Sequence, residues 1–265
     1  MSYLNTSWWI IPFILCVASG ILCPAMGTVL LTHKRLLQVN LISHCVLPGL
    51  ALATALGVNT SIGGVISGLA GAIAAESLTN KKNANYEAVM NTILAGSLGL
   101  GVMLIPLLGI RINLEAVLFG DLLIANIDDL LRTIFSFLTF ILLMIFGYKK
   151  LVLIGLDPEN AEANGINVSF LNLLLGLTTA LVIVSSLRAV GVILVISLLS
   201  TPTLLGLAKA PSLWVAMMRS SIFGFLISTS GFLVGIIFNL SPGPVISVIC
   251  VGALILVNWK NNLSN

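Results

Sequence analysis

Two polar side chains with metal-binding chemistry stand in an apolar stretch of the sequence. Asn40 precedes His44 by four residues, which places both on one face of a helix. Imidazole nitrogen and amide oxygen suit a divalent first-row cation. Lys34 and Arg35 mark a membrane interface, and His44 follows them by a helical rise of about 13 Å. The pair is therefore predicted near the middle of a bilayer, where polar residues by default face a bundle interior or a pathway.

The same residues allow a plainer interpretation, in which His44 is a neutral histidine hydrogen-bonded to another helix. Pro48 and Gly49 follow it by one turn and can bend the helix or free backbone carbonyls. The chain has two histidines, and the second, His33, stands at the interface. Because no HExxH motif or Cys/His cluster occurs, a hydrolytic or structural-zinc site has little material, and we do not expect an enzyme.

Composition makes lipid the main solvent of this chain. Of its 265 residues, 58% are hydrophobic and 8% are charged, against about 25% charged in a soluble domain. The apolar runs are too long for barrel strands, so we expect an all-α, polytopic integral membrane bundle in one domain over residues 1–265. Eight or nine spans are predicted. The runs lie at 8–31, 41–58, 60–78, 88–108, 131–148, 168–187, 190–208, 221–239 and 244–258.

Basic residues predict the orientation. With nine spans, most of them fall on one side of the membrane, which the positive-inside rule makes cytoplasmic, so the N-terminus lies outside and the C-terminus inside. These residues are Lys34, Arg35, Lys81, Lys82, Lys149, Lys150, Lys209, Arg219 and Lys260. On the outer side, Asp121 could attract cations or be a solvated loop acid. The net charge of +3 reflects the basic residues of the cytoplasmic side and does not indicate a nucleic-acid partner.

Two further segments carry information. In residues 149–168, Asp157 is a typical N-cap, Pro158 a first helical residue and Gly165 a stop signal. They predict a short amphiphilic cytoplasmic helix within about 156–166, either a docking surface or an ordinary loop helix. Residues 188–210 combine small residues with Pro202, which suits close helix packing or the lining of a path.

Together these segments resemble the membrane permeases of ABC importers for manganese, zinc and iron. The second-span pattern G-D-A-L-S-H-A-V-L-P-G is similar to residues 39–49, and D-P-E-x-A-x-x-x-G-I is similar to residues 157–166. Two more patterns, A-V-G-V-x-L-V-x-x-L-L-x-x-P and L-P-T-G-P, are similar to residues 189–202 and 240–244. The four matches occur in order and cover nearly the whole chain.

The resemblance implies a dimer of permeases, cytoplasmic ATP-binding subunits and an extracytoplasmic metal-binding protein. It implies that the segment with Asp157, Pro158, Glu159 and Gly165 is the coupling helix that docks on the ATPase. It also implies that His44 and its i−4 partner line the metal path. The family usually has an aspartate where Asn40 stands, so this station lacks a negative charge at that position.

We therefore expect a permease in a bacterial inner or plasma membrane that passes Mn²⁺, or Zn²⁺, into the cytoplasm. It would hold no permanent cofactor, and ATP would be hydrolysed by a separate protein. A permease for a metal chelate of the siderophore or cobalamin type is the nearest alternative. A proton-coupled secondary transporter would need an ionisable residue deep in a span, and this chain offers only His44 in that role.

Overall fold

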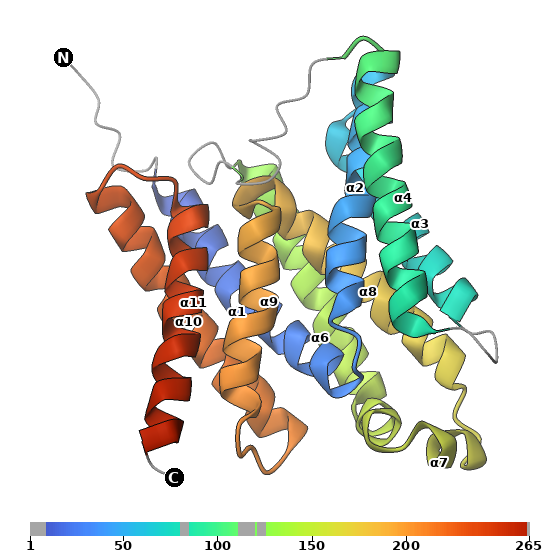
Figure 1. Cartoon of the computed structure of the whole chain (residues 1–265), viewed down its shortest axis with the longest axis vertical. Helices are drawn as coiled ribbons and strands as arrows, with labels where there is room; N and C mark the ends of the chain where they lie inside the picture. The colour runs from blue at the N-terminus through green and yellow to red at the C-terminus, as the bar shows by residue number, and fades with distance from the viewer. Residues whose placement is uncertain (1–8, 80–84, 111–119, 121–125, 264–265) are drawn as a thin grey trace. The chain divides into compact units, whose positions relative to one another are not determined.

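Helices make up almost all of the described chain (Figure 1). A computed structural model describes residues 9–79, 85–110, 120 and 126–263, and these residues form no strand. The long helices are α1 (Ile10–Thr32), α2 (Leu37–Ala55), α3 (Thr60–Thr79), α4 (Tyr86–Leu107), α6 (Ile127–Leu156), α8 (Val168–Val190), α9 (Val192–Leu207), α10 (Leu213–Ile237) and α11 (Pro242–Leu263). One short helix, α7 (Pro158–Ala163), stands between α6 and α8.

These helices confirm the predicted all-α membrane fold. Seven of them are long and apolar enough to cross a bilayer, and two shorter apolar helices, Val192–Leu207 and Pro242–Val257, coincide with the seventh and ninth predicted runs. Each predicted run has its own helix in the described ranges. The orientation of the two termini stays a prediction.

Helix α6 is longer than its predicted run of 131–148. It continues beyond Lys149 and Lys150 to Leu156, and its 30 residues extend about 45 Å. A pair of lysines at an interface does not break a helix. The helix ends because Asp157 precedes a proline, which disfavours the helical conformation, and Asp157 takes extended backbone angles (φ −150°, ψ 94°).

The described residues form two compact units. The first comprises residues 1–29, 115–135 and 185–265, and the second comprises residues 30–114 and 136–184. Helices α9, α10 and α11 therefore belong to the first unit, and α2, α3, α4 and α7 belong to the second. The organisation of residues 1–265 as a single domain stays a prediction.

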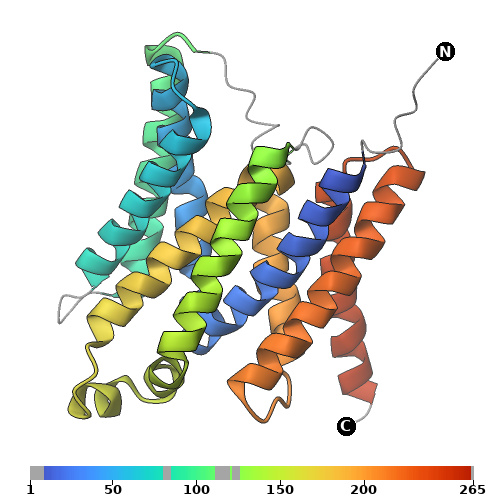
Figure 2. The same ribbon diagram turned by 180° about the vertical axis from the view of Figure 1, so that it is seen from behind.

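Small residues allow the helices of the first unit to approach closely. A Cβ atom on Gly27 would overlap the Leu199 carbonyl of α9, and one on Gly206 would overlap Ser220 of α10. Thr203 of α9 donates a hydrogen bond of 3.1 Å to the carbonyl of Pro24 in α1. The small residues predicted in segment 188–210 thus serve helix packing at Gly206 and Thr203, and Figure 2 shows α1 beside α10 from behind.

In the second unit α2 packs against both α3 and α4. Gly49 of α2 and Gly63 of α3 meet so closely that a Cβ on either would overlap the other's carbonyl oxygen. Farther along the same pair of helices, Ser67 donates to the carbonyl of Cys45. Cys45 itself is buried, as are the other three cysteines.

Candidate functional site

Asn40 and His44 lie on the part of α2 that the protein leaves partly open. Most of the helix is buried, including Ser43 and Cys45 on either side of the histidine. Asn40 and His44 are both half-buried, and they share one stripe of the helix because four residues separate them. Neither side chain is sealed in the core. The predicted common face is therefore present, while the role of the pair as metal ligands stays a prediction.

Pro48 adds an oxygen atom to this stripe. Helix α2 runs without interruption from Leu37 to Ala55, with Pro48 inside it. Proline has no backbone N–H, so the carbonyl four residues earlier loses its intrahelical partner. That carbonyl belongs to His44. The backbone thus offers a free acceptor at the residue whose imidazole is the candidate ligand, and the helix is not broken.

No larger cluster of metal-binding side chains accompanies the pair. In the part of the chain that the structure describes, no three His, Cys, Asp or Glu residues gather into a group that could hold a metal ion. The donors that α2 itself can supply are one imidazole, the Asn40 amide oxygen and the free carbonyl of His44. Such a set suits brief contact with a passing cation better than storage.

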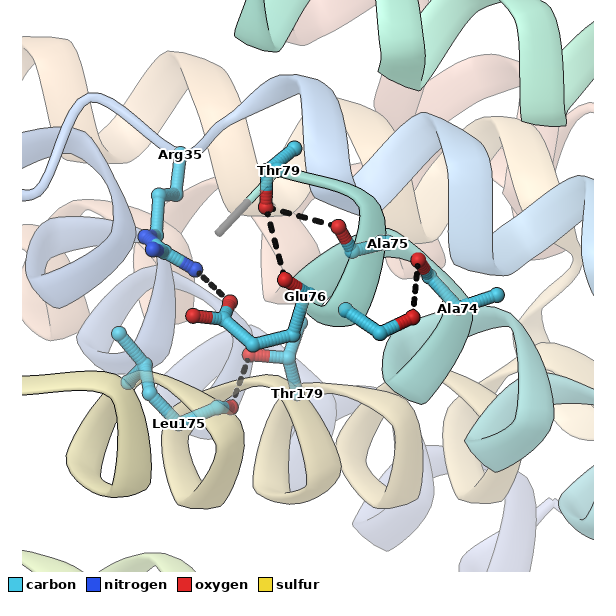
Figure 3. Close-up of polar contacts among 8 residues, drawn as sticks. Arg35, Ala74, Ala75, Glu76, Thr79, Leu175 and Thr179 are labelled. Carbon is cyan, nitrogen blue, oxygen red and sulfur yellow. Dashed lines mark hydrogen bonds and ion pairs between the residues drawn. The ribbon is translucent and has the colours of Figure 1, made fainter. Parts of the chain in front are cut away.

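The sequence analysis missed a buried ion pair at the start of α2. Arg35 Nη1 lies 2.6 Å from Glu76 Oε2, and the ring of Tyr86 lies 5.8 Å from Arg35 Cζ. Figure 3 shows this pair beside Leu175 and Thr179 of α8. Glu76 is only 7% exposed, although it precedes Lys81, at the predicted cytoplasmic side, by only five positions. One signal was available, because Glu76 is the sole acid among residues 60–79.

Helix α7 confirms the predicted start and stop signals. Asp157 Oδ1 accepts the Asn160 N–H at 3.0 Å, and Pro158 is the first helical residue. Gly165 has a φ of +74°, its N–H bonds the Glu162 carbonyl at 2.9 Å, and the next residue bonds back to Ala161 at 3.1 Å. These two hydrogen bonds form the Schellman motif, in which a glycine with left-handed backbone angles ends the helix.

The surface of α7 is polar and projects from the unit. Ala161 is fully buried and belongs to a small apolar cluster with Ile154, Val168 and Leu171 from the flanking helices. Asp157, Pro158, Glu159, Asn160, Glu162 and Gly165 are all exposed. Figure 2 shows α7, in olive, as a separate short element between α6 and α8. Helix α7 thus has one buried apolar anchor and exposed polar and acidic residues, and its role in docking stays a prediction.

Of the acids near the predicted outer side, the structure describes Asp128 and Asp129. Asp121 lies outside the described residues. Asp128 is exposed, whereas Asp129 is buried, accepts the Asn126 N–H at 3.1 Å and lies 3.6 Å from Arg132. Asp129 therefore stabilises the start of α6, where a negative charge also favours the helix dipole.

Within the described ranges, seven helices long and apolar enough to span a bilayer, two shorter apolar helices and one short, capped polar helix form a polytopic membrane protein. The chain belongs to the ABC 3 transport family, whose profile matches residues 9–261.

Two curated relatives and one solved structure show how close the similarity is. The manganese import system permease protein ScaB of Streptococcus parasanguinis is 32% identical over 230 residues, which cover 87% of this chain and 82% of ScaB. The chelated iron transport system membrane protein YfeD of Yersinia pestis is 29% identical over 233 residues, with coverages of 88% and 78%. The structure of PsaBC from Streptococcus pneumoniae in complex with Fab matches with a TM-score of 0.82 at 28% identity, and it covers 94% of this chain and 90% of that chain.

Proposed function

We propose that this chain is the membrane-spanning permease of an ABC importer that passes a divalent transition metal, Mn²⁺ first, into the cytoplasm. The observation that carries the proposal is the pair of half-buried polar side chains, Asn40 and His44, on one stripe of a mostly buried, apolar helix. A bilayer makes such residues costly, so their position favours a role on a transport path. The relation to ScaB, by name a manganese import permease, supports the same cargo.

Manganese is preferred over zinc because of the donor types. One imidazole with amide and carbonyl oxygens suits the harder ion, whereas zinc is better served by more nitrogen or by thiolate. The second candidate cargo is chelated iron, which the similarity to YfeD favours. A chelate would need a wider passage and would not need an imidazole ligand, so the effect of changing His44 separates the two.

Energy would come from partners. In this proposal two copies of the permease form the pathway, an extracytoplasmic binding protein delivers the metal, and cytoplasmic ATP-binding subunits hydrolyse ATP. The ATPase docks on the exposed residues of α7, which Ala161 anchors to the ends of α6 and α8. Closure of the ATP-binding subunits would then move these helix ends and switch the pathway from outward-open to inward-open. In this proposal α7 and the C-terminus lie in the cytoplasm.

Metal accumulation in a strain that lacks the gene tests the proposal. Cellular Mn, Zn and Fe are measured by mass spectrometry after complementation with the wild type, with His44→Ala or with Thr54→Ala. Thr54 is the matched control, because it lies on α2, is exposed and bonds only its own helix at Leu50. We expect the wild type and the control to restore Mn and His44→Ala to fail at equal protein level.

Three other results would change the conclusion. Unchanged Mn, Zn and Fe in the deletion strain would refute the function. A deletion that lowers only iron, with His44→Ala as active as the wild type, would favour the chelate cargo. Restoration of Mn by His44→Ala would remove that side chain from the mechanism.

A further inference from the structure

The ion pair of Arg35 and Glu76 joins the ends of three helices. Arg35 stands in the link between α1 and α2, Glu76 lies in the last turn of α3, and Tyr86 is the first residue of α4. Arg35 Nη1 and Glu76 Oε2 are 2.6 Å apart, and their side chains are only 13% and 9% exposed. The Tyr86 ring adds a cation–π contact to the same guanidinium. Figure 3 shows Arg35 reaching Glu76 across the gap between the helix ends.

The pair neutralises two charges that are partly buried between helix ends. The start of a helix carries partial positive charge and its end partial negative charge. Glu76 places an anion in the last turn of α3, where it is unfavourable, whereas Arg35 lies after the end of α1 and before the start of α2 and so faces helix ends of both signs. Removing one partner leaves the other charge buried and unpaired, which is far worse than removing both.

The start of α2 has little else to fix it on this side. Leu36 occupies the N-cap position and supplies no side-chain hydrogen bond. The Arg35 carbonyl instead accepts the Gln38 N–H at 3.0 Å. On the other side, the fully buried Gln38 side chain lies against Gly176 of α8, where a Cβ would come within 2.6 Å of its Nε2. Arg35 thus fixes the first turn of α2 through both its backbone and its side chain.

The same link lies next to the segment that leads into α7. A Cβ on Gly155, near the end of α6, would be 3.5 Å from His33 Cε1 and 3.6 Å from the Thr32 carbonyl. Gly155 precedes Asp157 by two positions, and His33 precedes Arg35 by two positions. A short contiguous path inside one unit thus joins the segment before α7 to the start of α2.

We propose that Arg35, held by Glu76 and Tyr86, is a positioning residue that sets where α2 presents Asn40 and His44. The inference deepens the proposed function and rests on it for its effect on transport. Asn40 and His44 follow Arg35 by helical rises of about 8 and 13 Å, so a rotation or tilt at the first turn moves both side chains together. The contacts of Arg35 with Glu76 and Tyr86 form a clamp that holds Asn40 and His44 in the position for metal contact. Loosening this clamp lowers the fraction of permease in which these two side chains are correctly placed.

Two measurements on the full-length permease test the clamp. The first is amide hydrogen exchange in residues 37–43 of the purified protein, which reports the order of the first turns of α2. The second is uptake of ⁵⁴Mn²⁺ by cells that carry each variant, as a function of Mn²⁺ concentration. The variants are Glu76→Gln, Arg35→Gln and the charge exchange Arg35→Glu with Glu76→Arg. Lys34→Gln and Glu87→Gln are the matched controls, because both side chains are exposed.

Each single variant should speed exchange in residues 37–43 at least tenfold. It should also raise the half-saturating Mn²⁺ concentration about tenfold, with the maximal rate within about twofold, because high metal selects the correctly placed fraction. The charge exchange restores an ion pair at the same place, so both values should return toward those of the wild type. The controls should match the wild type.

Several results would overturn the positioning role. Wild-type exchange in Glu76→Gln would show that the pair does not hold α2. A lower protein amount with an unchanged half-saturating concentration would reduce the pair to a structural one, and an exchange variant no better than the singles would exclude the charge mechanism. If the wild type restores no Mn²⁺ uptake, the proposed function fails, while the hydrogen exchange data still decide whether the clamp exists.

Discussion

The crossing of α2 and α3 predicts a sharp difference between two identical substitutions. Gly63 meets Gly49 at a point where neither helix has room for a side chain. Gly96 stands in the middle of α4, where a Cβ atom would have no neighbouring atom within 4 Å. Both glycines are helical and lie in apolar spans. Gly63→Ala and Gly96→Ala therefore differ in packing and in little else.

The magnitude follows from two terms. Adding a methyl group at Gly63 forces α2 and α3 apart, and overpacking of this kind costs about 1–3 kcal/mol. Replacing glycine by alanine within a helix gains up to about 1 kcal/mol from backbone entropy, and at Gly96 nothing opposes that gain. Because both helical glycines share this gain, the two variants should differ by the packing cost of about 1–3 kcal/mol in the free energy of unfolding.

Thermal unfolding of the detergent-purified permease measures this difference. In chains of roughly this size each kcal/mol moves the midpoint by about 2–4 °C. We expect Gly63→Ala to unfold several degrees below Gly96→Ala, which should unfold at or slightly above the wild-type temperature. A midpoint for Gly63→Ala equal to or above that of Gly96→Ala would refute the close crossing, and with it the support that α3 provides to the helix of His44.

Three further outcomes are expected. Asp157→Ala removes the acceptor of the Asn160 N–H and should cost about 1 kcal/mol in α7, seen as faster amide exchange in residues 159–163 that Asp157→Asn does not share. Glu159→Arg reverses an exposed charge and should reduce co-purification of the ATPase, so a wild-type yield would contradict docking on α7. Asn40→Asp should raise metal retention or alter the preference between Mn²⁺ and Zn²⁺ in competition uptake, and an unchanged preference would place Asn40 off the path.

Local rules explain how much of the fold could be predicted. Apolar runs locate the spans because a chain with so few charges must expose most of its surface to lipid. The short helix α7 could be placed because Asp157, Pro158 and Gly165 act through their own backbone neighbourhood. The end of α6 could not be placed as well, because its lysine pair was taken as a boundary, whereas the restriction imposed by Pro158 on Asp157 ends the helix.

Tertiary pairing explains what could not be predicted at the candidate site. Helical periodicity alone put Asn40 and His44 on one stripe. The partner of Arg35 is 41 residues away on another helix, and no local pattern distinguishes it from the acids that face solvent. The burial of the two charges against each other becomes visible only when the helix ends are known to meet. The role of α2 in a metal path stays a prediction, because the contacts of Arg35 with Glu76 and Tyr86 do not test it.

The departure at Asn40 and the presence of Pro48 have a common physical consequence under the proposed function. An aspartate at position 40 would give a divalent ion a full charge partner, and at the middle of a bilayer that charge costs about 3 kcal/mol. Asn40 avoids this cost but weakens the attraction. Pro48 frees the His44 carbonyl, which supplies an oxygen dipole without a charge. A station built from neutral donors binds the ion less tightly and releases it more readily, which suits a permease that receives its cargo from a binding protein and must pass it on.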